Sequence, residues 1–237
     1  MDTYQDKPHI ALLPGLEGTG EFFSPIIPYL EKHFKIHVVR YTDEVTFNDY
    51  VNSALDQIPK DTPISLVAES FSGLIAIALL ESKNPNYRAS VLSAAFCKSP
   101  LPFFTKLSKY LPKWFFSSNA VSKALIDLLA TGADATPDIR DKARELFDKG
   151  SSSQFQNRVN IINKVNLCRK LKKIKAPLLY IQATEDDIVL SDSGAKIKKR
   201  AKNIKMVRVK GSHLILQTQP EKCAELIISH ITSNSQT

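Results

Sequence analysis

The sequence of 237 residues lacks any continuous apolar run of about 18 residues, the length that a membrane-spanning helix requires. It also lacks a basic segment followed by an apolar one near its beginning, because MDTYQDKPHIALL passes from polar residues directly into a strand-like pattern. These two absences argue against a secreted or membrane-spanning protein, and we expect a cytoplasmic one.

Cysteine is scarce as well. The three cysteines, Cys97, Cys168 and Cys223, are odd in number and widely separated, without the paired spacing of a metal site. We therefore expect buried free thiols in a reducing compartment, and packing is the favoured role for Cys97, which follows a predicted strand.

The chain does contain a regular alternation of short apolar runs and helical patterns. The strand-like runs are His9–Leu13, Ile36–Arg40, Ile64–Ala68, Arg88–Ser93, Leu178–Gln182 and Lys205–Val209. The helical patterns are Pro25–His33, Phe47–Gln57, Phe71–Ser82, Ser191–Ala201 and Pro220–Ser233. Such alternation predicts an α/β fold, with a mostly parallel sheet of about six strands and helices on both faces.

The stretch ISLVAESFSGLIAIALL, residues 64 to 80, runs a strand directly into a helix with Ser70 at the bend. A sharp turn of this kind needs small neighbours, and Ala68 and Ser72 replace the glycines of the usual G-x-S-x-G pattern. Ser70 is thus placed to act as a nucleophile, and the backbone N–H of Phe71 lies where an anionic oxygen would bind. The alternative is that Ser70 only caps the helix.

A serine hydroxyl needs a base and an orienting acid to become a good nucleophile. Asp186 follows the strand-like Leu178–Gln182, and His213 lies in a loop after Lys205–Val209. The order serine, aspartate, histidine is the order expected of an α/β-hydrolase. Asp187 competes with Asp186 for the role of the acid. Taken singly, Asp186 is better explained as a solvated loop carboxylate and His213 as a loop residue before a helix. Three such residues in this order, each after a separate predicted strand, indicate a catalytic triad.

Glycine is sparse, yet three of the eight glycines fall in the segment LPGLEGTG, between residues 15 and 20. Their spacing is not that of a phosphate-binding G-x-x-x-x-G-K-[ST] loop, and no acidic ribose partner follows at the right distance. A hydrolase needs a second backbone donor from the loop after its first core strand. Leu16 is our candidate for that donor, with Phe71 as the other.

These motifs give the chain a resemblance to the α/β-hydrolase superfamily over essentially its whole length apart from the middle. More narrowly, LPGLEGTG, AESFSG and SAAFCKSPLP resemble a group of bacterial α/β-hydrolases that carry LPG-x-[DE]-GTG and AESFSG. The broader layout is similar to that of the pimeloyl-carrier-protein methyl esterases of biotin synthesis. The resemblance implies an esterase or thioesterase fold with Ser70, Asp186 and His213 as the triad, and it identifies no substrate.

Two positions depart from the common pattern of the superfamily. Pro14 replaces the histidine that often precedes the glycine of the oxyanion loop, and Glu69 stands before the serine where histidine is frequent. We expect Glu69 to point into a polar pocket or to bond the oxyanion loop, and we assign it no catalytic role.

The region 99–166 contains no readable strand, and we expect it to be an inserted helical lid. The α/β-hydrolase core would then comprise residues 1–98 and 167–237. An apolar inner face of the lid would suit an acyl chain or an aromatic ester, although aromatic stripes at helical spacing are as often core. The candidate substrate contacts in the lid are Phe103, Phe104 and Trp114.

The formal net charge of +8 favours encounters with acidic partners in a salt-dependent way. Lys106, Lys109 and Lys113 interleave with the lid aromatics, a pattern that suits an acidic acyl carrier protein, an anionic lipid surface or only solvent. The run KIKKRAKNIK, residues 196 to 205, is better explained as a solvated face. No nucleic-acid-binding motif occurs, so we expect no nucleic acid partner.

The sequence thus predicts a serine esterase that cleaves a small-molecule or acyl ester through an acyl-enzyme, with no metal or organic cofactor. An acyl thioesterase or acyltransferase would use the same triad, and carbon–carbon or haloperoxidase chemistry is also possible on this scaffold. From another class, the chain could be a ligand-binding protein that retained a hydrolase fold. An intact triad argues against that alternative, because a receptor does not need all three members.

Overall fold

A computed structural model describes residues 7–82, 84, 86–100, 135–149 and 152–234. Its centre is a six-stranded sheet in the order β2-β1-β3-β4-β5-β6, in which all neighbouring strands are parallel. The strands are β1 (His9–Leu13), β2 (Lys35–Val38), β3 (Ile64–Glu69), β4 (Ser90–Ser93), β5 (Leu178–Ala183) and β6 (Ile204–Val209). The predicted parallel sheet is confirmed, and β2 and β4 are slightly shorter than expected.

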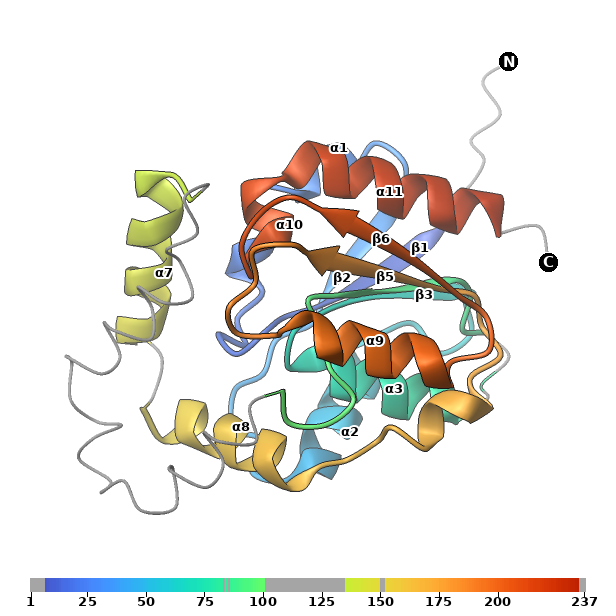
Figure 1. The fold of residues 1–237 in the computed structure, drawn as a ribbon, viewed down its shortest axis with the longest axis horizontal. Coiled ribbons are helices and arrows are strands. Elements are labelled where there is room, and N and C mark those ends of the chain that lie inside the picture. Colours follow the sequence, from blue (N-terminus) through green and yellow to red (C-terminus); the bar gives the residue numbers. More distant parts are fainter. Residues whose placement is uncertain (1–6, 83, 85, 101–134, 150–151, 235–237) are drawn as a thin grey trace.

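Helices cover both faces of the sheet (Figure 1). One face carries α1 (Ile27–Leu30) and α11 (Pro220–Ser233), and the other carries α2 (Phe47–Gln57), α3 (Ser72–Glu81) and α9 (Ser191–Arg200). Along β1, Ile10 and Leu12 pack into one apolar core, while Ala11 and Leu13 pack into the other. Burial on both faces explains why the strands form continuous apolar runs. No helix in the described ranges is long and apolar enough to cross a bilayer.

The predicted helix Pro25–His33 is the main error in the placement of elements. Only Ile27–Leu30 is α-helical, and the 3-10 turn η1 (Glu21–Phe23) precedes it. Pro28 accounts for the late start of α1, because a helix that began at Pro25 would need the N–H of residue 28 for its first hydrogen bond. Two further short elements are η2 (Lys170–Lys173), which precedes β5, and α10 (Ile215–Thr218), which lies between β6 and α11.

The described part of the region expected to be a lid contains two helices, which lie between β4 and β5 in the sequence. They are α7 (Pro137–Lys149) and α8 (Ser152–Lys164). The apolar residues that join α7 to the core are Phe22, Ala143, Leu146 and Leu214. Lys142 of α7 also pairs with Glu21 at 2.6 Å. The residues of this region that lie outside the described ranges include the expected aromatic contacts Phe103, Phe104 and Trp114 and the lysines Lys106, Lys109 and Lys113.

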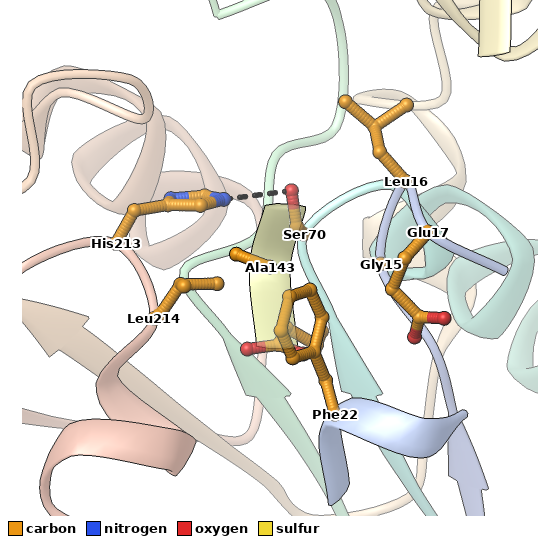
Figure 2. A pocket seen from close by; sticks show the side chains of 9 residues that line it. Gly15, Leu16, Glu17, Phe22, Ser70, Ala143, His213 and Leu214 are labelled. Carbon is orange, nitrogen blue, oxygen red and sulfur yellow. Dashed lines mark hydrogen bonds between the residues drawn. The ribbon is translucent and has the colours of Figure 1, made fainter. Parts of the chain in front are cut away.

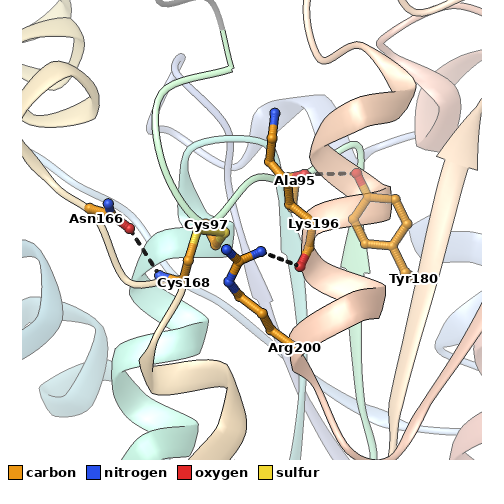
Figure 3. The surroundings of a disulfide bond; sticks show 7 residues. All are labelled: Ala95, Cys97, Asn166, Cys168, Tyr180, Lys196 and Arg200. Carbon is orange, nitrogen blue, oxygen red and sulfur yellow. Dashed lines mark hydrogen bonds between the residues drawn. A yellow bond between two sulfur atoms is a disulfide. The ribbon is translucent and has the colours of Figure 1, made fainter.

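Cys97 and Cys168 form a disulfide, so the expectation of three free thiols is wrong. The bond joins the chain just after β4 to the chain just before η2 (Figure 3). Leu167 N donates to Cys97 O at 2.7 Å, which holds the two segments side by side. The two cysteines are 71 residues apart in the sequence, and their segments meet through an isolated antiparallel bridge between Lys98 and Asn166 that no sequence pattern predicts. Cys223 remains free and is buried.

The disulfide predicts how many thiols the protein presents. Unfolded in denaturant without reductant, the chain should give one thiol with a colorimetric thiol reagent, and it should give three after reduction. Three thiols before reduction would contradict the bond.

The disulfide also predicts a loss of stability on its removal. Closing a loop of this length stabilises a fold by about 4 kcal/mol in the chain-entropy model. Joint replacement of Cys97 and Cys168 by alanine should therefore lower the denaturation midpoint well beyond the effect of Cys223→Ala.

Candidate active site

Ser70 occupies the sharp turn between β3 and α3. Its φ of 50° lies in the left-handed region, which few residues other than glycine adopt and which often marks functional sites. Ser70 N donates to Ser93 O at 3.0 Å, and Gly73 N donates to Ser70 O at 2.9 Å. The turn is therefore held on both sides and leaves the serine at the carboxyl end of the sheet.

Close packing explains the small residues around this turn. A Cβ atom on Gly73 would lie 2.5 Å from the Cβ of Ala95, so α3 can pass the loop after β4 only with glycine there. Ser72, which stands where the usual motif has glycine, donates its hydroxyl hydrogen to Pro14 O and lies 3.1 Å from Tyr41 Oη. The residue that departs from the motif thus ties α3 to the glycine-rich loop.

The structure brings Ser70, His213 and Asp186 together (Figure 2 shows the first two). His213 Nε2 lies 3.0 Å from Ser70 Oγ, and His213 Nδ1 lies 2.9 Å from Asp186 Oδ2. The other oxygen of Asp186 accepts the backbone N–H groups of Ile188 and Val189 at 2.9 and 2.7 Å, which fixes the carboxylate. All three side chains are buried. Such a chain of hydrogen bonds can move a proton from the hydroxyl to the imidazole.

Burial and charge act in opposite directions on His213. Burial lowers its pKa, whereas the charge and hydrogen bond of Asp186 and the charge of Glu69 raise it, and the net pKa lies above the ordinary value of 6.5. The competing candidate, Asp187, is exposed, and the hydrogen bond to His213 comes from Asp186.

Glu69 is buried directly before the serine. Gln217 of α10 donates its amide N–H to Glu69 Oε2 at 3.2 Å. Burial raises the pKa of Glu69 to about 7, against the opposing effect of His213. Glu69 lines the cavity beside Ser70, but that cavity is mostly apolar where a polar one was expected, and the hydrogen bond of Glu69 goes to α10 and not to the oxyanion loop. Gln217 could not be identified from sequence, because α10 is a single turn that has no periodic pattern.

The glycine-rich loop after β1 folds around the carboxylate of Glu17, which accepts several hydrogen bonds from the loop. This carboxylate accepts the hydroxyl of Thr19 at 2.6 Å and the N–H of Gly20 at 3.1 Å, and it also accepts the N–H of Thr19. Burial raises the pKa of Glu17, and these hydrogen bonds act in the opposite direction. Its carboxylate is therefore used to shape the loop.

The two expected oxyanion donors lie beside the serine. Leu16 and Ser70 line one cavity of about 30 Å³, and Phe71 is the N-cap of α3. This space is large enough for a water molecule or a carbonyl oxygen. Neither the Leu16 nor the Phe71 N–H donates a hydrogen bond to another group in the described part of the chain. The apolar wall consists of Leu16, Phe22, Ala143 and Leu214, as Figure 2 shows.

Arg158 of α8 was not among the candidate residues, and it also contacts this loop. Its side chain is buried, with 3% exposure, and Nη1 donates to Leu16 O at 2.7 Å and to Glu17 O at 3.1 Å. Nη2 donates to Tyr41 O at 3.4 Å, and the guanidinium carbon lies 5.7 Å from the centre of the Tyr50 ring. An arginine on a polar helix resembles a solvent-facing residue, so its burial follows only from the tertiary structure.

No cluster of three or more His, Cys, Asp or Glu side chains suited to a metal ion is found within the described ranges.

Comparison with known proteins agrees with this architecture. Solved structures with the same fold include an enol-lactonase from Burkholderia xenovorans, with 17% identity, a TM-score of 0.83 and coverage of 98% of this chain and 94% of that one. A lipase-esterase related protein from Clostridium acetobutylicum has 21% identity and a TM-score of 0.80, with 95% and 96% coverage. A bromoperoxidase from Bacillus anthracis has 14% identity and a TM-score of 0.82, with 95% and 92% coverage.

At these identities the structural likeness shows the fold, which is that of the α/β-hydrolases, and the predicted fold class is confirmed. No curated protein sequence matches the chain. The model of one sequence family, described as serine aminopeptidase S33, matches residues 36–216. That match covers most of the sequence, and the chain therefore belongs to the serine aminopeptidase S33 family of hydrolases.

Proposed function

We propose that the protein is a serine esterase that cleaves carboxylic esters through an acyl-enzyme. The observation that supports this most is the continuous hydrogen-bond chain from Ser70 through His213 to Asp186. Ser70 Oγ attacks the ester carbonyl while His213 Nε2 takes the hydroxyl proton. His213 then delivers that proton to the departing alkoxide. Water attacks the acyl-enzyme by the same route and releases the acid and free Ser70.

The remaining groups orient the base and bind the oxyanion. Asp186 accepts the Nδ1–H of His213, which leaves Nε2 as the basic nitrogen that faces Ser70. The N–H groups of Leu16 and Phe71 bind the oxygen that becomes negative in the tetrahedral intermediate. In other enzymes one donor of this kind contributes about 10²–10³ in rate.

The surroundings of the serine favour an ester over a peptide. The family description makes a substrate with a free amino group the second candidate, because two buried carboxyl groups line the cavity. However, Glu17 is already bonded to the loop, and Glu69 has one oxygen bonded to Gln217. An ammonium group would therefore find one unbonded carboxylate oxygen, whereas an ester finds an apolar wall.

The finer assignment follows from the sequence motifs. The resemblance to carrier-protein methyl esterases supports methyl esters of acyl chains, either free or bound to an acidic acyl carrier protein, as the first substrates to test. Acyl thioesters, and transfer to an acceptor other than water, would use the same acyl-enzyme. In this proposal residues 99–166 form an inserted lid, and Ala143 of α7 is its described contribution to the cavity wall.

The nucleophile is tested by Ser70→Ala, with Ser82→Ala at the far end of α3 as a control. Hydrolysis of p-nitrophenyl esters of graded chain length should fall by about 10⁶ in turnover for Ser70→Ala, and fluorophosphonate labelling should disappear. Ser82→Ala should retain both. If the native protein neither labels nor hydrolyses any ester, the esterase proposal fails, and the ligand-binding alternative becomes the one to pursue. Turnover of aminoacyl p-nitroanilides alone would favour the peptidase.

The orienting acid is tested by a pair of neighbouring substitutions. Asp186→Asn should lower kcat by about 10⁴, because the amide no longer fixes the required tautomer of His213. Asp187→Asn should leave kcat within about twofold, as expected for an exposed side chain outside the hydrogen-bond chain. A larger loss in Asp187→Asn than in Asp186→Asn would reverse the assignment.

The pH profile tests the electrostatics of the base. His213 must be neutral to accept the proton of Ser70, so kcat/KM should fall as the pH drops through its raised pKa, with a midpoint above 6.5. Glu69→Gln removes a negative charge that raises this pKa, so the midpoint should move to lower pH. Glu81→Gln, which changes a surface carboxyl paired with Lys170 and Lys173, should leave the midpoint in place. An unshifted midpoint in Glu69→Gln would show that its charge does not act on His213.

A further inference from the structure

We propose that Arg158 is a positioning residue that fixes the direction of the Leu16 N–H by holding the backbone next to it. The inference rests on the proposed function, in which this N–H binds the oxyanion. It assigns α8, a helix that contributes no residue of the triad, a role in the chemical step.

The contacts of Arg158 are made almost entirely with backbone carbonyl groups. Its two terminal nitrogens reach Leu16 O and Glu17 O at 2.7 and 3.1 Å and, more weakly, a third carbonyl at 3.4 Å. Hydrogen bonds from a charged donor are about twice as strong as neutral ones, and burial excludes competing water. The guanidinium therefore fixes the peptide group between Leu16 and Glu17.

The peptide group that carries the Leu16 N–H lies between two anchored neighbours. On its amino side, Pro14 O accepts the hydroxyl hydrogen of Ser72, which belongs to the helix that follows the nucleophile. On its carboxyl side, Leu16 O accepts Nη1 of Arg158. Rotation of the donor peptide would require one of these neighbours to turn as well. Loss of Arg158 frees the carboxyl side, and the N–H is no longer held toward the serine.

The loop is shaped around the guanidinium. Gly18 has a φ of 76°, and a Cβ atom there would lie 2.4 Å from Nη2 of Arg158 and 2.5 Å from its Cζ. The glycine thus supplies both the left-handed backbone and the room for a buried arginine. Lysine would not replace Arg158, because a single ammonium nitrogen lacks the planar fork that places Nη1 on Leu16 O and Glu17 O and Nη2 on Tyr41 O at the same time.

A comparison with Asn157, the neighbouring residue on α8, distinguishes a positioning role of Arg158 from simple anchoring of the helix. Asn157 donates its amide to Glu44 O at 2.9 Å and to Val45 O at 2.8 Å, in the segment after β2. It ties α8 to the core in the same manner, by side-chain bonds to backbone carbonyls, and these carbonyls lie outside the oxyanion loop. Asn157→Ala is therefore the matched control for Arg158→Ala.

The test uses the full chain and the best ester from the chain-length series. In Arg158→Ala, kcat should fall by about 10²–10³, the loss of one oxyanion donor, while KM changes little. The second-order rate of fluorophosphonate labelling should fall in parallel. Added guanidinium ion at millimolar concentration should restore part of the lost kcat, because it can occupy the vacated site. In Asn157→Ala, kcat should stay close to the native value, and guanidinium should have no effect.

Each outcome separates the inference from the function on which it rests. Equal losses of kcat in Arg158→Ala and Asn157→Ala, or a change in KM alone, would overturn the positioning role while leaving the esterase intact. A native protein without esterase activity or labelling would instead overturn the proposed function, and the inference with it. If Arg158→Ala does not fold, Arg158→Lys decides, since it keeps the charge but should still lose kcat at constant KM. Native kcat in a folded Arg158→Lys would overturn the proposal.

Discussion

The left-handed turn at Ser70 is the constraint on which the rest of the site depends. A non-glycine residue keeps a φ of 50° only when its surroundings impose it. Here the imposing contacts are the hydrogen bond from Ser70 N to Ser93 O and the close passage of Gly73 beside Ala95. Ser72, two residues later, links this turn to the glycine-rich loop by its hydrogen bond to Pro14 O. The position of Ser70 and that of the glycine-rich loop beside it are therefore set together.

The parts of the site that could be anticipated from the sequence are those that follow strands. In a parallel sheet all carboxyl ends meet at one edge, so a serine, an aspartate and a histidine that each follow a separate strand converge there. Local pattern was enough to single out Ser70, Asp186 and His213, and the structure brings their side chains within hydrogen-bond distance. The pattern failed at the start of α1, because helical spacing alone does not count the N–H donor that Pro28 lacks.

What sequence reasoning missed depends on contacts between distant segments. The Cys97–Cys168 bond needs the antiparallel bridge between Lys98 and Asn166, and the Glu69–Gln217 hydrogen bond needs a one-turn helix that no periodicity reveals. Arg158 lies in a helix of mixed polarity, and its burial depends on the space left by Gly18, 140 positions earlier in the chain. Such features follow from tertiary packing, which overrides local propensity.

The fold alone does not settle the chemistry, because a lactonase, a lipase-esterase related protein and a bromoperoxidase share it at low sequence identity. The hydrogen bonds that hold the glycine-rich loop to α3 and α8 say more about this chain than the fold does. One side of the Leu16 N–H is tied to α3, and the other is tied through Arg158 to a helix that lies between β4 and β5 in the sequence. The disulfide and the Leu167 N–Cys97 O bond close the base of that same insertion. Under the proposed function, a displacement of α8 would change the direction of the Leu16 N–H through Arg158, so sequence changes in the insertion would alter the rate of the chemical step as well as the fit of the substrate.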